Sequence, residues 1–175
     1  PARGRAPTHP MTTRIDTLIV GAGQAAAQRE PRLADAGHEH VLLERGRLGQ
    51  RWHERWDSLT LLSPNWMNTL VGGAAHADPH GFVDRAQLLD YLTGYASSFG
   101  APVVEGVDVT RVERHPAGFL VRSSAGDWLA RNVVVATGDA DVPHVPLAAP
   151  HGTHALHAAA YRRPGRRCPA RPPRP

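Results

Sequence analysis

Residues 16–44 read DTLIVGAGQAAAQREPRLADAGHEHVLLE, and the rest of the chain is organised around this stretch. Asp16–Val20 is a short apolar run that ends at a glycine turn, Gly21-Ala22-Gly23. A helical stretch follows, and a second apolar run, Val41–Leu43, ends at an acid, Glu44. The pattern predicts a strand, a glycine turn, a helix and a second strand.

The glycine turn has the G-x-G-x-x-A spacing of a dinucleotide-binding βαβ unit. In that unit Gly21 allows the tight turn, Gly23 lets the backbone approach a pyrophosphate, and Ala26 fills a small slot where helix packs on strand. The helix N-terminus offers N–H groups to the phosphates. Glu44 stands where a carboxylate would hold ribose hydroxyls. The glycine spacing alone is weak evidence, but the flanking strand and the acid make it specific.

The predicted helix contains one anomaly, a proline at position 31 within the polar run Ala27–Arg32. A proline in a helix interior lacks the N–H group and clashes with the carbonyl four residues earlier, at a cost of roughly 3 kcal/mol. We therefore expect the helix to kink or break at Pro31. It should resume through Leu33 and end at Gly37, which suits a helix C-cap.

The charge of the chain is concentrated at its ends. The formal net charge is +4 and all 20 basic residues are arginine, but eight of them lie in residues 1–10 and 162–175, which hold no acid. The remaining 12 arginines face 16 acids, so the body of the chain is acidic. This distribution argues against nucleic-acid binding.

Other functional classes find little support in the composition. The chain has one cysteine, Cys168, so it holds neither a disulfide framework nor a C-x-x-C pair. No apolar run approaches the length of a membrane span, and we expect a cytoplasmic protein that does not bind membranes. The histidines His151, His154 and His157 lack neighbouring cysteines or acids at metal-ligand spacing, so we predict no metal site.

The middle of the chain combines a long loop with a helix. Residues 45–73 are irregular and carry Trp52, Trp56 and Trp66. A loop this long is often functional, but we expect these indoles to fill the core beneath it. Residues 84–99 read as an amphipathic helix with Asp84 as N-cap and Gly100 as the stop, and its apolar face is Leu88, Leu89, Leu92 and Tyr95.

The following part is β-structure. Strands are predicted over residues 102–105, 107–114, 118–124 and 128–136, and the last ends in Ala136-Thr137-Gly138. The fold class is therefore α/β, a Rossmann-like domain with a parallel sheet and a small antiparallel insert at residues 107–131.

Several segments of the sequence resemble those of a known family. The glycine turn with Glu44, the Ala136-Thr137-Gly138 strand end and the prolines at 143 and 146 look like the flavin-dependent oxidoreductases with two dinucleotide domains. Within these, the segments 55–64 and 84–96 and the G-x-x-x-H-x-x-x-Y-like residues Gly152, His157 and Tyr161 resemble flavin-containing monooxygenases. The nearest group is the plant auxin-forming YUCCA type with its bacterial relatives. The resemblance covers about residues 16–163.

The resemblance implies an FAD cofactor and names its contacts. The turn residues Gly21, Gly23, Gln24, Ala25 and Ala26 would hold the pyrophosphate, and Glu44 the ribose; the adjacent Arg45 is also expected to bind the cofactor. Trp52 would lie near the flavin, Val109 would offer backbone to the adenine, and Thr137 and Gly138 would close against the cofactor. In the family NADPH reduces the flavin, and a C4a-hydroperoxide then oxygenates a small organic substrate.

Departures from the family pattern leave alternatives open. The asparagine that the classical monooxygenases place beside the flavin falls near Leu62 in this chain. The family's Gly-Gly pair before the tryptophan is replaced by Gly49-Gln50. No second glycine turn for NADPH follows Tyr161. The chain could thus be the FAD-binding part of a monooxygenase, a non-catalytic truncated fragment, or a simple NAD-binding dehydrogenase domain. Catalytic residues, substrate and oligomeric state are not specified by the sequence.

The expected domain organisation follows from these assignments. We expect residues 1–10 to be disordered and residues 11–150 to form the FAD-binding domain. Residues 151–163 would link it to an absent NADPH-binding domain, and residues 164–175 would be a disordered Arg/Pro tail.

Overall fold

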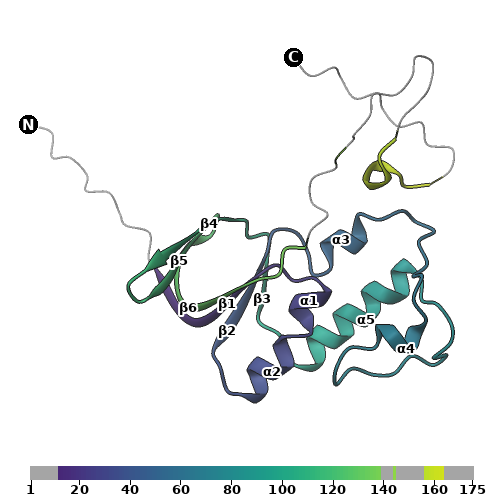
Figure 1. The fold of residues 1–175 in the computed structure, drawn as a ribbon, viewed down its shortest axis with the longest axis horizontal. Helices are drawn as coiled ribbons and strands as arrows, with labels where there is room; N and C mark the ends of the chain where they lie inside the picture. The colour runs from purple at the N-terminus through teal and green to yellow at the C-terminus, as the bar shows by residue number, and fades with distance from the viewer. Residues whose placement is uncertain (1–11, 139–143, 145–155, 164–175) are drawn as a thin grey trace, which may run out of the picture.

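A computed structural model describes residues 12–138, 144 and 156–163. One six-stranded sheet has the strand order β3-β2-β1-β6-β5-β4 (Figure 1). Strands β1, β2, β3 and β6 run parallel, whereas β4, β5 and β6 pair antiparallel. The strands are β1 Thr13–Val20, β2 His40–Glu44, β3 Val103–Glu105, β4 Val109–His115, β5 Gly118–Ser123 and β6 Gly126–Val135. The predicted α/β class with an antiparallel insert is confirmed.

Strands β1 and β2 each hold three consecutive buried residues, as strands covered on both faces do. On β1, Leu18 and Ile19 are both fully buried but point to opposite faces, because successive side chains alternate across a strand. Ile19 packs with Ala26 beneath the first helical segments, and Leu18 packs with Val121 beneath the antiparallel strands. Helical segments thus cover one face of β1, and antiparallel strands of the same sheet pack against its other face.

The predicted break in the first helix is confirmed, but it falls before Pro31 rather than at it. Helix α1 covers Gln24–Ala27 and α2 covers Glu30–Asp35, with the proline in the first turn of α2. An N–H is not needed in a first turn, so proline fits there. The Gly37 N–H donates to Ala34 O and the His38 N–H to Leu33 O, so α2 ends in a Schellman motif at the predicted cap.

The predicted amphipathic helix is α5, Arg85–Ser98. Asp84 caps it in a capping box, because its carboxylate accepts from the Gln87 N–H while the Gln87 side chain accepts from the Asp84 N–H. Leu88, Leu92 and Tyr95 are buried on its inner face. They form a separate cluster beneath the long loop that follows β2.

That loop contains two short helices, α3 Gln50–His53 and α4 Asn65–Asn68. The prediction that its indoles fill the core is wrong for Trp66, which is 59% exposed. Trp52 and Trp56 are half-buried, and Trp52 packs at the edge of the α5 cluster. A short helix on the surface leaves one face without a partner, so an indole there lies in solvent.

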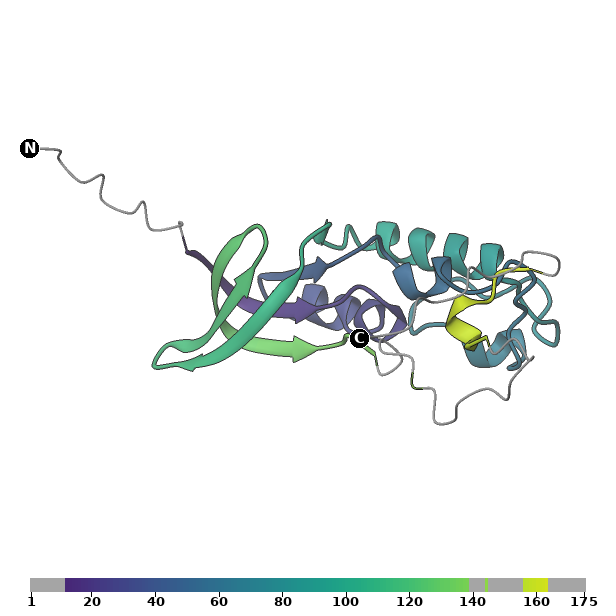
Figure 2. The same cartoon turned by 90° about the horizontal axis from the view of Figure 1, so that it is seen from above.

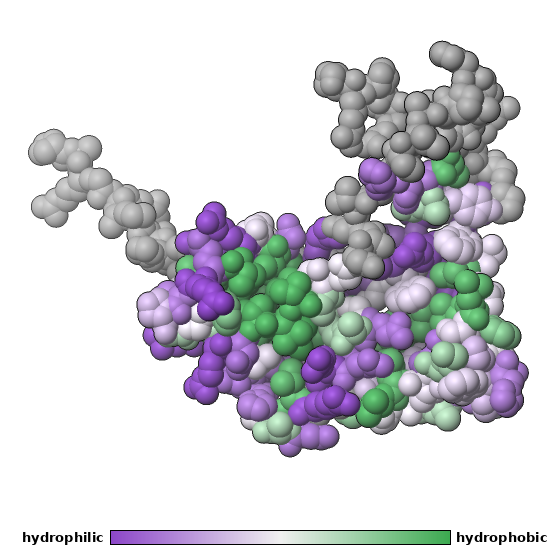
Figure 3. All heavy atoms as spheres, in the orientation of Figure 1, coloured by the Kyte–Doolittle hydropathy of each residue, from purple (hydrophilic) through white to green (hydrophobic). Residues whose placement is uncertain are grey.

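Seen from above, the β4–β5 hairpin and the α4–α5 region lie at opposite ends of the molecule (Figure 2). Apolar side chains also reach the surface, over the sheet and at the α4 end (Figure 3). The largest exposed fractions among them belong to Leu62 at 97% and Val135 at 70%.

The last described element is a 3-10 turn, η1, at Ala158–Ala160. Across the described part of the chain, no helix has the length and apolar character that crossing a membrane requires. The predictions for residues 1–10, for the tail at 164–175 and for His151, Gly152 and His154 lie outside the described residues.

Candidate cofactor-binding site

A cavity of about 590 Å³ opens at the carboxyl ends of β1, β2 and β6. Open α/β sheets bind ligands at this edge, next to the strand where the chain order reverses. Strand β1 is that strand here, since its neighbours are β2 on one side and β6 on the other. The cavity is lined by Val20, Gly21, Gly23, Gln24, Ala25, Leu43, Glu44, Arg45, Gly49, Gln50, Arg51, Trp52, Arg55, Val107, Asp108, Val109, Ala136, Thr137 and Gly138.

One wall of this cavity is backbone, and Gly21 fixes its shape. Gly21 has a φ of +101°, a region that side chains rarely tolerate. A Cβ atom there would lie 2.6 Å from the Ala136 carbonyl oxygen, so the turn and the end of β6 can meet only through a glycine. The Gly21 N–H also donates to the Leu43 carbonyl at 2.8 Å. This glycine is required by the protein itself.

Gly23 differs from Gly21 in every one of these respects. Its φ is −87°, which any residue can adopt, and a Cβ built on it would meet no atom within 4 Å. Among the described residues, no contact therefore requires glycine here. Because Gly23 lines the cavity, the space that a side chain would fill belongs to the cavity itself.

Helix α1 begins directly after Gly23, and no side chain caps its start. The first N–H groups of any helix have no partner within the helix. The turn therefore presents backbone donors at the cavity wall beside the open side of Gly23.

The Glu44 carboxylate holds the glycine turn in place. Oε2 accepts from the Ala22 N–H at 2.7 Å, and Oε1 accepts from the Gly46 N–H at 2.8 Å. Each carboxylate oxygen has a second lone-pair direction that these bonds leave available. Glu44 thus links the turn to the end of β2 and keeps acceptor capacity at the cavity.

The opposite wall consists of side chains from α3 and the residues just after it. Gln50, Arg51, Trp52 and Arg55 line the cavity from this side. Gly49, in the left-handed conformation with a φ of +70°, begins the helix, and its N–H donates to the Ala22 carbonyl at 3.0 Å. The two walls are therefore joined at Ala22.

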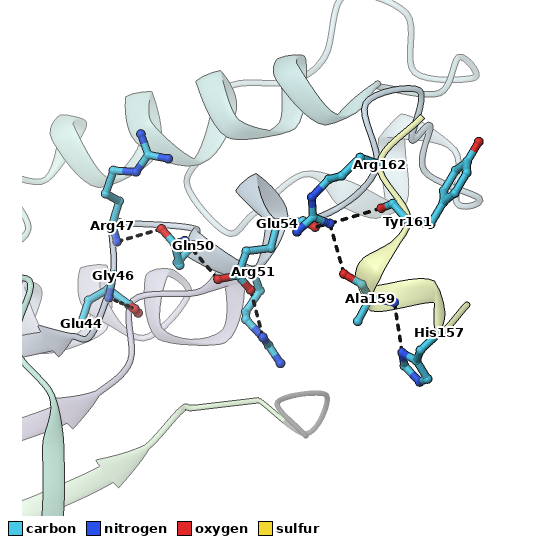
Figure 4. A network of polar contacts seen from close by, with 10 residues as sticks. All are labelled: Glu44, Gly46, Arg47, Gln50, Arg51, Glu54, His157, Ala159, Tyr161 and Arg162. Atoms are coloured by element: carbon cyan, nitrogen blue, oxygen red, sulfur yellow. Dashed lines mark hydrogen bonds and ion pairs between the residues drawn. The ribbon is translucent and has the colours of Figure 1, made fainter. Parts of the chain in front are cut away.

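Polar contacts organise this second wall (Figure 4). The Glu54 carboxylate accepts from Gln50 Nε2 at 3.1 Å and pairs with Arg51 at 3.0 Å. The hydrogen bond from Gln50 is the largest cause that lowers the Glu54 pKa, and Arg51 adds to it. Burial lowers the pKa of His53, and the nearby charges of Arg47 and Arg85 lower it further.

The structure brings together ten of the eleven residues predicted to bind the cofactor. They are Gly21, Gly23, Gln24, Ala25, Glu44, Arg45, Trp52, Val109, Thr137 and Gly138. Ala26 lies outside the cavity wall, because it is fully buried between α1 and the sheet. That position matches the packing role of the motif rather than contact with a cofactor.

Four polar lining residues escaped the sequence-based prediction: Gln50, Arg51, Arg55 and Asp108. Arg51 and Arg55 are four residues apart, the spacing that places two side chains on the same face of a helix. This spacing is the feature of the sequence from which the position of the two arginines on one wall could have been predicted. Together with Arg45 they make three arginines among the lining residues.

The model of the pyridine nucleotide-disulphide oxidoreductase family matches residues 18–165. The chain belongs to this family. A CzcO-like oxidoreductase of Geobacillus kaustophilus is 33% identical to it over 139 residues, which cover 75% of this chain and 38% of that protein.

Solved structures agree with the family assignment. A mutant of a flavin monooxygenase from Stenotrophomonas maltophilia is 29% identical, with a TM-score of 0.76 over 86% of this chain and 47% of that one. The bacillithiol disulfide reductase of Bacillus cereus shares the fold, with a TM-score of 0.67 at 20% identity over 75% of this chain and 44% of that one. The predicted resemblance to flavin monooxygenases is confirmed. The chain spans less than half the length of these relatives.

The residues of the cavity fit a flavin dinucleotide. The open side of Gly23 leaves room for a pyrophosphate against the backbone, and Glu44 keeps lone pairs for hydroxyl donors. Arginines on the lining can offset phosphate charge. The matching family is one of oxidoreductases, and the similar structure from Stenotrophomonas maltophilia is that of a flavin monooxygenase.

Proposed function

We propose that this chain is the FAD-binding part of an NADPH-dependent flavin monooxygenase that oxygenates a small organic substrate. One observation carries the proposal. Gly23 lies in the cavity wall, and no contact with the described part of the chain requires glycine there. Glycine is needed there if a ligand lies against the backbone, and the motif assigns that ligand as a pyrophosphate.

Different residues of the cavity would contact different parts of the cofactor. Backbone at Gly21–Ala25 would hold the pyrophosphate, Glu44 would accept from the ribose hydroxyls, and the backbone of Val109 would meet the adenine. Trp52 would lie near the flavin ring, while Thr137 and Gly138 would close the site from the end of β6. Apart from the buried Ala22, each of these residues lines the observed cavity.

Once bound, FAD would supply the redox chemistry, accepting electrons from NADPH and passing them to O2. The protein's task is to hold and orient the cofactor and to limit its contact with water. Arg45, Arg51 and Arg55 bring positive charge to the cavity, which favours a ligand that carries two phosphates.

Flavin content tests the proposal directly. The 175-residue chain is mixed with FAD, freed of excess ligand and assayed for bound flavin by absorbance, with FAD and FMN distinguished after release. We expect bound FAD in the parent chain and none in Gly23→Val, since the valine would fill the pyrophosphate space. Gly94→Val is the matched control, because Gly94 is exposed on α5 and also has open space around it. Equal flavin content in all three proteins would reject the site.

The same preparation separates FAD from the NAD-binding alternative. A simple dehydrogenase domain would bind NAD in this cavity and take up no flavin. Titration of the parent chain with NAD, followed by competition with FAD, distinguishes the two. Tighter binding of NAD than of FAD would favour the dehydrogenase.

We further propose that residues 1–175 do not by themselves oxidise NADPH. The described part of the chain contains one glycine turn of the dinucleotide type, and FAD would occupy it. NADPH oxidation by the FAD-loaded chain should therefore equal that of free FAD. Stopped-flow absorbance at the oxidised flavin band measures this, and rapid bleaching by NADPH would show that the chain is sufficient for reduction.

A further inference from the structure

The second wall of the cavity rests on a helix too short to be stable alone. Helix α3 has four residues, and isolated helices need about 12–15 to form in water. The carbonyl groups at the end of a helix also lack partners within it. Something outside α3 must therefore hold Arg51, Trp52 and Arg55 at the cavity.

Two arginines supply this support from distant parts of the chain. Three consecutive carbonyls, those of His53, Glu54 and Arg55, each accept a hydrogen bond from a guanidinium group. Cationic donors at the C-terminal end of a helix satisfy its carbonyls and interact favourably with its dipole.

Arg85, at the start of α5, is the first of the two. Its Nη1 donates to Arg55 O at 2.8 Å and to His53 O at 3.3 Å, and its Nη2 pairs with the Asp57 carboxylate at 3.2 Å. The capping box at Asp84 fixes the helix start from which this side chain extends.

Arg162 is the second, and it comes from the end of the described chain (Figure 4). Its Nη1 donates to the carbonyl of Glu54 and, at 3.2 Å, to those of Ala159 and Tyr161. Its own carbonyl accepts from the Asp57 N–H at 2.8 Å. One residue thus holds the segment after α3 at two points and ties it to η1.

We propose that Arg162 is a positioning residue for the cofactor cavity. It acts through the main chain of Glu54 and Asp57, which sets where α3 presents Trp52 and the two arginines. This inference rests on the proposed FAD site. No residue from 156 to 163 belongs to the buried core, so the role of Arg162 concerns the cavity wall rather than the stability of the whole domain.

Arg162→Ala tests the proposal against Arg163→Ala as matched control. Arg163 is the next residue, is exposed and carries the same charge. We measure the FAD dissociation constant, the thermal midpoint without FAD, and the indole N–H resonance of Trp52 without FAD, assigned with Trp52→Phe. Loss of one charge-assisted hydrogen bond at the wall should weaken FAD binding about tenfold and shift the Trp52 resonance. The midpoint should change by less than about 4 °C.

Arg162→Lys keeps a cationic donor for the Glu54 carbonyl and should recover most of the affinity. The proposal is overturned if Arg162→Ala matches Arg163→Ala in both affinity and resonance, or if lysine binds FAD no better than alanine. If the parent chain itself fails to bind FAD, the proposed function fails. The Trp52 resonance in the FAD-free protein still decides whether Arg162 positions α3.

Discussion

The two walls of the cavity are built in opposite ways. The first is main chain at the ends of β1 and β6, shaped by Gly21 and tied to β2 through Glu44. The second consists of side chains on and just after α3. Arg85 and Arg162 hold it, although they lie 32 and 108 residues along the chain from the carbonyls of His53 and Glu54 that they contact. Each element of the backbone wall is specified by residues that are neighbours in the sequence, whereas the side-chain wall depends on contacts with distant residues. Five substitutions and a change of pH can test this difference.

The largest expected effect is on folding, at Gly21 in the backbone wall. Gly21→Ala places a Cβ atom 2.6 Å from the Ala136 carbonyl and forces a side chain to a φ of +101°. We expect a loss of about 3 kcal/mol or more in the free energy of unfolding. Urea unfolding followed by circular dichroism measures it. Gly23→Ala is the control and should unfold like the parent; equal stability of the two variants would contradict the contact with β6.

The next effect is on binding alone, at Gly23. Gly23→Val should abolish FAD binding while the unfolding free energy changes by less than about 1 kcal/mol, because a side chain there meets only the cavity. Flavin retention and urea unfolding are measured on the same preparation. A variant that loses stability and keeps its flavin would show that Gly23 has a structural role instead.

A smaller effect is expected at Glu44, which holds the glycine turn and would also bind the ribose of the cofactor. Glu44→Ala should weaken FAD binding by about 1–3 kcal/mol, the range for losing a charge-assisted hydrogen bond. It should also lower stability, since the Ala22 and Gly46 N–H groups lose their acceptor. Calorimetric titration and urea unfolding give the two values. An unchanged affinity with a large loss of stability would leave Glu44 only its structural role.

The smallest effect concerns the side-chain wall and pH. Burial lowers the pKa of His53, and the charges of Arg47 and Arg85 lower it further. The imidazole therefore binds a proton less readily in the folded chain than in the unfolded chain, where it becomes protonated below about pH 6.5. Stability is therefore fully present above that pH and falls as the pH drops towards the folded pKa.

Urea unfolding at pH 7 and pH 5 should show this loss in the parent and a smaller one in His53→Gln. The Glu54 pKa is also lowered, so its contribution is lost at lower pH, below about 4.5. An identical pH dependence in parent and variant would exclude His53 as the cause.

The contrast between the walls also explains what the sequence could predict. The glycine turn, the acid that ends β2 and the Thr137-Gly138 strand end are local patterns, and all lie at one cavity. The α5 helix was predictable from its N-cap and apolar spacing, and the strands of the insert from their alternating runs. In each case the residues that specify the element are neighbours in the sequence.

The side-chain wall could not be predicted in the same way. Arg51 and Arg55 reach the cavity because α3 forms, and α3 depends on Arg85 and Arg162. The exposure of Trp66 follows from the short helix α4, for which no periodic pattern exists in four residues. The sequence predicts the break at Pro31, whereas the structure has it just before Glu30, because proline suits the first turn of the helix that begins there.

Strand β6 has a consequence for how the molecule is made on the ribosome. It lies between β1 and β5, and its residues 128–135 pair with residues 13–20 at the start of the described chain. A nascent chain therefore carries β1 with one open edge until residue 135 has emerged. Such distant pairing slows folding and leaves an unpaired strand edge exposed meanwhile. The glycine turn is synthesised early, but the cavity beside it is completed only when the end of β6 arrives against Gly21.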